Sequence, residues 1–320
     1  MKICTITCQN TVNHGARLQC YALAHWLQKQ GHEVEVIDYR PPRSRNKKLW
    51  YMPKASIEDW LKLFSQFTYR KKNLERRKIF DAFSQKYIPL TKHIYFKLSD
   101  LRKNPPVADV YIAGSDQIWN TTLPNGTDPA YYLDFGPSSV RRESFAASFA
   151  TKELRPGTES FVQDHLKRFD KITVREQSSL KILEDLGLKG LQQEDPVFLL
   201  TASEWDEIAD GTGAGEKYLL VYDFYLGDDI KIEAIKIAKE RDLKIYNVSH
   251  SNLSYADKNF VYVGPETFVS LVKNASFVIS NSFHGTAFAI IYDVPFKVLD
   301  RPDGLNIRMY DLLERHGYIK

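Results

Sequence analysis

Short apolar stretches alternate with amphipathic helical stretches along the whole of this 320-residue chain. Residues 2–7 are apolar and β-branched, residues 16–30 repeat apolar side chains at helical spacing, and residues 34–39 form a second apolar run. Strands that alternate with helices in this way are typical of parallel sheets with helices on both faces. The chain is therefore expected to be an α/β protein.

The same alternation continues to the end of the chain. It predicts further strands at residues 110–113, 143–150, 171–174, 218–222, 244–248, 260–263, 277–280 and 296–299. It predicts further helices at residues 158–169, 178–186, 228–240, 266–274 and 287–292, and a closing helix at residues 308–317. The chain is long enough for two α/β units, and parallel sheets carry ligand loops at the carboxyl ends of their strands.

The boundary between the two units is marked by Asp195-Pro196-Val197-Phe198 and then by a polar, glycine-rich stretch at residues 210–216. The glycines of the second stretch precede a strand and lack the spacing of a phosphate-binding loop, so we interpret that stretch as a linker. We expect an N-terminal Rossmann-like domain at residues 1–200 and a C-terminal Rossmann-like domain at residues 201–320, which face each other across a cleft.

Positive charge is concentrated in one window of the sequence. Residues 43–78 hold twelve Lys and Arg side chains against three acidic ones, whereas the whole chain has a net charge of +4. A local block of this kind favours one anionic partner over nucleic acid in general. We interpret residues 43–98 as a basic and aromatic helical insertion with one apolar stripe, formed by Ile57, Trp60, Leu61, Phe64 and Phe67. Two compatible hypotheses are docking on an anionic membrane and packing of the stripe on the N-terminal domain.

The composition is that of a soluble protein, with 43% hydrophobic and 26% charged residues. The first ten residues lack the apolar core of a secretory signal, and no run approaches the roughly 18 apolar residues of a spanning helix. The three cysteines, Cys4, Cys8 and Cys20, form no disulfide framework and no zinc pattern. We therefore expect a cytoplasmic protein without a metal site.

The strongest local motif is Ser280-Asn281-Ser282-Phe283-His284-Gly285-Thr286, which lies between a predicted strand and a predicted helix. Unpaired N–H groups at a helix start form a ready site for an anion. Gly285 lets a ligand approach the backbone, His284 can become cationic, and Ser282 and Thr286 can cap the helix or donate. The alternative is an N-cap turn with a packed histidine, but the position at a strand end favours the anion site.

Arg175 follows the strand predicted at residues 171–174. A guanidinium at the carboxyl end of a strand would point into the cleft and could bind a carboxylate or phosphate with two hydrogen bonds. The alternative is a surface ion pair with Glu176.

Two further clusters follow strands of the first unit. Gly114-Ser115-Asp116-Gln117-Ile118-Trp119-Asn120 combines a carboxylate, an amide and an indole, which is typical of a sugar site with the aromatic ring stacked on the sugar. Asp116 is also the best candidate for acid–base chemistry, and the alternative for Trp119 is to fill a gap in the core.

The second cluster is Asn13-His14-Gly15-Ala16-Arg17-Leu18-Gln19, where Gly15 makes room for a ligand that Asn13, Arg17 and Gln19 could reach. A capped helix start explains this motif equally well.

Together these clusters resemble the polysaccharide pyruvyl transferase family. The resemblance rests on NHGARLQCYAL at 13–23, GSDQIW at 114–119, FAASFA at 145–150, VRE at 174–176, DPV at 195–197 and SNSFHGTAFAII at 280–291. The order and spacing of these stretches make the match specific, and they span nearly the whole chain. The family is similar in architecture to GT-B glycosyltransferases, which have two facing Rossmann-like domains.

The resemblance implies a cytoplasmic transferase that moves the pyruvyl group of phosphoenolpyruvate onto hydroxyls of a hexose in a lipid-linked precursor of a surface polysaccharide, such as capsule or exopolysaccharide. The product would be a pyruvate ketal, phosphate would be released, and no cofactor is implied. The N-terminal domain would hold the acceptor, and the C-terminal domain would hold the donor phosphate. An enzyme with a lipid-linked acceptor would lie at the inner face of the membrane, which residues 43–78 would contact.

The resemblance carries His284 and Arg175 as donor-binding positions. We expect Asp116 and His284 to be the catalytic residues. The expected donor-binding residues are Arg175, Asn281, Ser282, His284, Gly285, Thr286, Lys297 and Arg308. The expected acceptor-binding residues are Asn13, Gly15, Arg17, Gln19, Ser115, Asp116, Gln117 and Trp119. Many members carry an arginine where this chain has Ser282, and Lys297, Arg301 and Arg308 are the candidates to replace it.

Two other functions remain open from the sequence. A nucleotide-sugar-dependent GT-B glycosyltransferase would use the same architecture and bind a diphosphate at the His284 turn. A non-catalytic glycan-binding protein is the other alternative, but the joint presence of Arg175, His284 and Asp116 argues against it.

Overall fold

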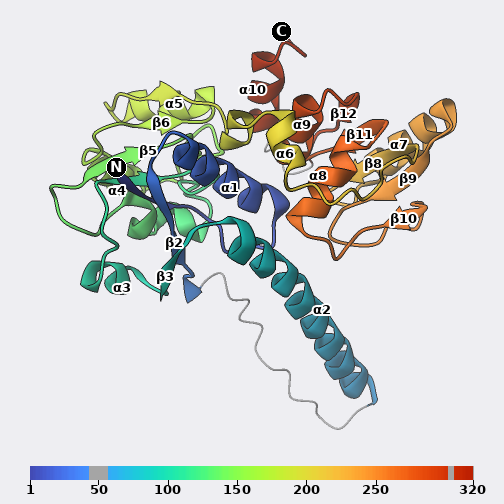
Figure 1. The fold of residues 1–320 in the computed structure, drawn as a ribbon, viewed down its shortest axis with the longest axis horizontal. Coiled ribbons are helices and arrows are strands. Elements are labelled where there is room, and N and C mark those ends of the chain that lie inside the picture. Colours follow the sequence, from blue (N-terminus) through green and yellow to red (C-terminus); the bar gives the residue numbers. More distant parts are fainter. Residues whose placement is uncertain (43–56, 302–305, 320) are drawn as a thin grey trace.

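The computed structural model describes residues 1–42, 57–301 and 306–319, without the side chains of residues 57–71. Two parallel five-stranded sheets lie side by side, each flanked by helices (Figure 1). The strand orders are β3-β2-β1-β4-β5 and β10-β9-β8-β11-β12, so each sheet is wound outward in both directions from a central pair. The predicted α/β class with two Rossmann-like sheets is confirmed.

The first sheet is built from the first half of the chain. Its strands and helices are β1 (Lys2–Ile6), α1 (His14–Lys29), β2 (Glu33–Tyr39), α2 (Ile57–Tyr87), β3 (Leu90–Tyr95), α3 (Leu98–Lys103), β4 (Val110–Ala113), β5 (Arg141–Ser144) and α4 (Glu159–Leu166). A two-stranded sheet follows, with β6 (Thr173–Val174), α5 (Gln177–Asp185) and β7 (Leu191–Gln192). Three short 3-10 helices are η2 (Pro124–Thr127), η3 (Pro129–Tyr132) and η4 (Pro196–Leu199).

The second sheet is built from the second half of the chain. Its elements are α6 (Ala202–Asp206), β8 (Tyr218–Tyr222), α7 (Asp228–Arg241), β9 (Lys244–Asn247), β10 (Lys258–Asn259), α8 (Pro265–Lys273), β11 (Phe277–Ser280), α9 (Phe283–Ile291), β12 (Phe296–Val298) and α10 (Ile307–Arg315). The sequence missed β3, β7, α3 and α6, which are short or lie at a sheet edge, where few side chains are buried.

Three predicted boundaries are wrong for local reasons. The strand predicted at 143–150 ends at Ser144, because Ala146 and Ala150 have positive φ angles of 46° and 58°, which no strand residue adopts. Residues 260–263 form no strand, because the two-residue β10 ends at Asn259 and the chain then leaves the sheet for Gly264 at the start of α8. Helix α9 begins four residues earlier than predicted, because the side chain of Ser282 caps it, so His284 lies inside its first turn.

The predicted insertion at 43–98 is shorter than expected. Strand β3 is an edge strand of the first sheet, paired with β2, so only α2 and the segment before it are inserted. Helix α2 projects away from both sheets (Figure 1), and its 31 residues correspond to about 46 Å. Near its end, Phe80 and Phe83 are buried. The predicted apolar stripe lies on the described backbone of α2, but its side chains and those of most of the basic block are outside the described part of the structure.

The two halves are joined by packed helices. Helix α1 contacts η4, α8 and α9, and one hydrophobic cluster extends from Leu18 and Leu23 in α1 to Phe268 in α8 and Phe288 in α9. Helix α10, between the halves in Figure 1, packs on α9 and also returns to the first half, where Asp311 accepts hydrogen bonds from the Gln177 N–H and the Gln192 amide. The carboxyl ends of the central strands are thereby brought together.

Candidate active site

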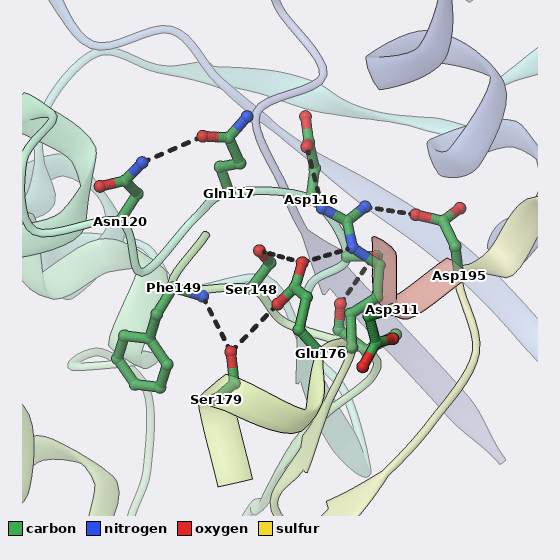
Figure 2. A network of polar contacts seen from close by, with 12 residues as sticks. Asp116, Gln117, Asn120, Ser148, Phe149, Glu176, Ser179, Asp195 and Asp311 are labelled. Atoms are coloured by element: carbon green, nitrogen blue, oxygen red, sulfur yellow. Dashed lines mark hydrogen bonds and ion pairs between the residues drawn. The ribbon is translucent and has the colours of Figure 1, made fainter. Parts of the chain in front are cut away.

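Arg175 lies at the centre of a buried cluster of carboxylates. Its side chain is 2% exposed, and its Nε donates to Glu176 Oε1 at 3.0 Å. Its Nη1 donates to Asp195 Oδ2 at 2.5 Å, and its Nη2 lies 3.9 Å from Asp116 Oδ1. Figure 2 shows the three carboxylates arranged around this guanidinium. The predicted orientation of Arg175 into an open cleft is therefore wrong, and the alternative of a surface pair with Glu176 is wrong as well, because both side chains are buried.

The charges in this cluster stabilise one another. Burial acts to lower the pKa of Arg175, but the charges of Glu176, Asp195 and Asp116 raise it above its ordinary range. Burial acts to raise the pKa of Asp195, yet His284 and Arg175 together hold the pKa of this carboxyl well below its usual range. Glu176 also accepts from the hydroxyls of Ser148 at 2.6 Å and Ser179 at 3.0 Å (Figure 2). Arg175 and Asp195 therefore form a buried ion pair at neutral pH, and the two serine hydroxyls fix the position of Glu176.

His284 joins this cluster from the other half of the chain. Its Nε2 lies 3.7 Å from Asp195 Oδ2, the same oxygen that accepts from Arg175. Its ring lies directly against the backbone of Gly15 in α1, where an added Cβ would stand 2.0 Å from His284 Nδ1. Gly15 therefore makes room for the catalytic candidate itself, and the first turns of α1 and α9 meet at this point.

Arg308, in the first turn of α10, supplies a second buried guanidinium. Its Nη atoms lie 2.9 and 2.8 Å from the side-chain amide of Gln117, which accepts from them when its oxygen faces Arg308. The same amide lies 3.0 Å from Asn120 Nδ2, so two donors compete for one oxygen (Figure 2). Burial, followed by the repulsion from Arg175, lowers the pKa of Arg308 to about 10. Of the three candidates to replace the missing arginine at Ser282, Arg308 is the one that stands beside Arg175.

Several buried donors of this region have no hydrogen-bond partner among the described residues. They are Arg175 Nη2, His284 Nε2, Arg308 Nε and, on the same turn as His284, Thr286 Oγ1. An unpaired buried donor costs about 1–3 kcal/mol, so such groups in one region indicate a ligand that accepts from them. The arrangement suits a small dianion or trianion with acceptor oxygens on more than one side. No group of His, Cys, Asp and Glu among the described residues has the arrangement of a metal site.

Several predicted acceptor residues are buried and form hydrogen bonds within the fold. Trp119 is fully buried, its Nε1 donates to the Tyr131 carbonyl at 3.0 Å, and its ring stacks on Tyr132 with centroids 5.7 Å apart. It fills the core and cannot stack on a sugar, so that prediction is wrong. Gln19 is also buried, donates to Thr7 Oγ1 at 3.0 Å and accepts from the Ser115 N–H at 3.2 Å.

Three more acceptor candidates hold the fold together. Asn13 caps α1 by accepting from the Ala16 N–H at 3.1 Å. Arg17 is 2% exposed and donates from Nη2 to Asp81 of α2 at 3.0 Å, so it ties α2 to α1. Ser115 donates to the Ala146 carbonyl at 2.6 Å. A polar side chain in a loop after a strand predicts a ligand only when the side chain is not needed for these internal bonds.

Most of the predicted donor-binding residues around His284 also form contacts within the fold. Asn281 donates to Asp223 Oδ1 at 2.6 Å, Ser282 caps α9, and an added Cβ at Gly285 would stand 2.5 Å from Ser280 Oγ, so this glycine serves packing rather than ligand approach. Lys297 donates to Glu233 of α7 at 2.8 Å and is not part of the cluster.

Two important residues were missing from the sequence-based site. Glu176 and Asp195 are 1% exposed and hold Arg175 in place. The sequence did contain a signal, since both belong to stretches on which the family resemblance rests, VRE at 174–176 and DPV at 195–197. Their role depends on the contact between strand β6 and the segment before η4, which no local pattern reveals.

Two facing Rossmann-like units, with a buried site where the two halves meet, define a GT-B-like α/β enzyme. The chain matches the polysaccharide pyruvyl transferase family over residues 13–303. It therefore belongs to this family, and it is a transferase. A search of curated proteins finds no match.

Solved structures share the fold at low sequence identity. A candidate UDP-N-acetylglucosamine 2-epimerase from Listeria monocytogenes aligns with a TM-score of 0.53 and 10% identity, over 99% of this chain and 88% of that one. The UDP-GlcNAc 2-epimerase of Methanocaldococcus jannaschii in complex with UDP-GlcNAc and UDP aligns with a TM-score of 0.50 and 14% identity, over 93% of this chain and 84% of that one. At these identities the likeness shows the architecture alone.

Proposed function

We propose that the chain transfers the pyruvyl group of phosphoenolpyruvate to two hydroxyls of a hexose in a surface-polysaccharide precursor, forming a ketal. The observation that carries the proposal is the meeting of Arg175, Arg308 and His284, from three separate segments, each with an unpaired buried donor nitrogen. Phosphoenolpyruvate presents one carboxylate and one phosphate, and guanidinium groups bind both with charge-assisted hydrogen bonds. Membership of the pyruvyl transferase family supports the same reaction.

The reaction balances without a cofactor. A proton adds to the methylene carbon of the donor, and a sugar oxygen attacks the neighbouring carbon, which bears the carboxylate and the phosphate. The C–O bond to phosphate breaks, and a second sugar hydroxyl attacks the same carbon to close the ketal. The two hydroxyl protons end on the new methyl group and on the released phosphate, so no proton is gained or lost overall.

The cluster provides groups for each step. Arg308 and Arg175 would neutralise the donor anions, and His284 would donate a hydrogen bond or a proton to the phosphate as it leaves. Asp116, 16% exposed at its side chain, would accept the proton of the attacking hydroxyl. Because Arg175, His284 and Arg308 are 2%, 7% and 6% exposed, the donor reaches them only when the contact between α1 and α9 opens.

The proposal is tested by ligand-dependent thermal stabilisation and product analysis. Phosphoenolpyruvate should raise the melting temperature, whereas UDP-sugars should not, because a ligand that binds only the native state stabilises it. Incubation with phosphoenolpyruvate and lipid-linked galactose, glucose or N-acetylmannosamine acceptors should then give a ketal, detected by mass. Stabilisation by UDP-sugars alone would instead support a nucleotide-sugar glycosyltransferase.

Replacing Asp116 with asparagine should lower kcat by about 10²–10⁴-fold and change the affinity for phosphoenolpyruvate by less than threefold. The amide has nearly the same shape but cannot accept the proton of the sugar hydroxyl. Single-turnover rates and donor titrations on the same protein separate the two effects. An equal loss in donor affinity would place Asp116 at the donor and remove it from the proton transfer.

We further propose that residues 43–78 bring the enzyme to the anionic inner face of the membrane, where a lipid-linked acceptor would lie. Among the described residues no helix is long and apolar enough to span a membrane. Each cation near an anionic surface contributes about 1 kcal/mol, which salt screens. Binding to phosphatidylglycerol vesicles should therefore weaken at 0.5 M salt and when Lys47, Lys48, Arg70, Lys71 and Lys72 are changed to Gln, as measured by co-sedimentation.

A matched control changes five exposed lysines elsewhere on the surface to Gln: Lys152, Lys231, Lys236, Lys239 and Lys244. It removes the same charge and should leave vesicle binding unchanged. Equal binding to neutral and anionic vesicles, or equal loss in both variants, would rule out a specific role for the basic block.

A further inference from the structure

A separate pocket of about 190 Å³ opens at the carboxyl end of the first sheet. Its walls come from the segments after β1 and β2 and from η2 and η3, and they include Cys8, Asn10, Tyr39, Asn125, Asp128 and Tyr131. None of the residues proposed to bind the donor lines it. The volume is below the 300–1,000 Å³ typical of drug-sized ligands, which suits a single sugar ring.

Asn10 presents an unused donor in this pocket. Its side chain is buried, with the residue 7% exposed, and its Oδ1 accepts from Arg77 Nη2 at 2.7 Å. This contact fixes the orientation of the amide, and its Nδ2 has no hydrogen-bond partner in the part of the chain that the structure describes. Asn125 of η2 also lines the pocket, and its Nδ2 donates to the carbonyls of Gln117 at 2.6 Å and Ile118 at 3.2 Å, which leaves the Asn125 Oδ1 as an acceptor. A hydroxyl group, which both donates and accepts, matches this pair of amides.

The charge of the pocket excludes the donor substrate. Asp128 is the charged residue among those that line it, and its two oxygens already accept from the Tyr39 hydroxyl at 2.9 Å and the Ala130 N–H at 3.1 Å. No cation faces the pocket from its lining residues, so a phosphate or carboxylate would be repelled. Tyrosine rings together with amides are the surroundings in which neutral sugars bind.

The pocket adjoins the proposed proton acceptor. Asn125 bonds to the backbone of Gln117, the neighbour of Asp116. From the other side, burial raises the pKa of the Cys8 thiol to about 12, and the nearby carboxylate of Asp116 adds to the effect. Asp116 thus lies near the pocket wall at Cys8, and its Oδ1 is also 3.9 Å from Arg175 Nη2.

We propose that this pocket binds a neutral hexose ring, with a ring hydroxyl held between Asn10 Nδ2 and Asn125 Oδ1. Its role as the acceptor subsite rests on the proposed function, whereas the binding of a sugar does not. The acceptor then enters at the carboxyl end of the first sheet. Trp119, Gln19 and Arg17 do not contact it and instead stabilise the surrounding fold.

Saturation-transfer NMR with methyl gluco-, galacto- and mannopyranosides tests the binding without any turnover. Asn10→Asp keeps the acceptor oxygen for Arg77 but replaces the unused donor by a second acceptor, so sugar signals should fall by roughly tenfold. Thr11→Trp, at the rim, should block the pocket and remove the signals. Asn104→Asp makes the same chemical change at an exposed position after α3 and should leave them unchanged.

The outcomes separate this inference from the proposed reaction. Sugar signals that are lost in Asn10→Asp and Thr11→Trp, with unchanged stabilisation by phosphoenolpyruvate, support the subsite. Absent signals from the unaltered protein, or signals that persist in both variants, overturn it. Loss of phosphoenolpyruvate binding in Asn10→Asp also overturns it, because the pocket would then belong to the donor. If sugars bind here but phosphoenolpyruvate never binds the unaltered protein, the proposed reaction fails while the sugar site stands.

Discussion

Replacing His284 with alanine should lower kcat/KM for phosphoenolpyruvate by at least about 100-fold while the protein stays folded. The imidazole enters the cluster from α9, and its Nε2 has no hydrogen-bond partner among the described residues. Removing it deletes both the proposed contact to the leaving phosphate and an ion-pair partner of Asp195, whose Oδ2 lies 3.7 Å from His284 Nε2. Steady-state kinetics and a melting curve on the same preparation measure the two effects.

A second variant tests the position of the ring rather than its presence. Gly15→Ala would place a methyl group 2.0 Å from His284 Nδ1, so the imidazole must move away from Asp195. Activity should fall to nearly the level of His284→Ala, although no polar group has been removed. His250→Ala, which changes an exposed histidine, serves as the control and should retain full activity. Near-normal kcat/KM in His284→Ala would show that the donor binds elsewhere.

Replacing Arg175 with methionine should destabilise the fold by about 3–5 kcal/mol at neutral pH, in addition to abolishing activity. Methionine fills much the same space, but it leaves the buried carboxylates of Glu176 and Asp195 without their counter-charge. The loss should appear as a lower urea midpoint for unfolding. Arg155→Met, at an exposed position, should leave that midpoint nearly unchanged.

The destabilisation should depend on pH in a defined direction. In the native protein the pKa of Asp195 is depressed, so its ionised form contributes stability above the unfolded pKa near 4, and this contribution is lost only as the pH falls through the lower folded value. In Arg175→Met, burial instead raises the pKa of Asp195, so protonation of Asp195 removes the free-energy cost of a buried unpaired charge. The difference in stability between the two proteins should therefore be largest at neutral pH. It should begin to shrink above about pH 4, where the buried carboxyl of the variant takes up its proton, and should shrink further below about pH 4, where the native protein loses stability. A constant difference across this range would show that lost packing, not charge, causes the effect.

Helix and strand positions were largely predictable because burial imposes a period on the sequence. The apolar strands at Val110–Ala113, Tyr218–Tyr222 and Phe277–Ser280 were predicted to the residue, since all their side chains are buried. The edge strand Leu90–Tyr95 was not, because three of its six side chains are exposed and no such period exists. Membership of the pyruvyl transferase family was also predictable from the sequence, since it rests on short sequence stretches in a given order.

The tertiary structure decided which polar residues serve the site and which serve the fold. Trp119 and Asp116 stand three residues apart in one motif, yet one fills the core and the other faces the buried guanidinium. Local sequence cannot separate them, because each outcome depends on partners more than ten residues away, such as the Tyr131 carbonyl and Arg175. The sequence determined which side chains lie at the ends of the strands. The packing of α1 against α9 determined that Gly15, His284 and Asp195 meet, since long-range contacts set the direction of each side chain and the charge around it.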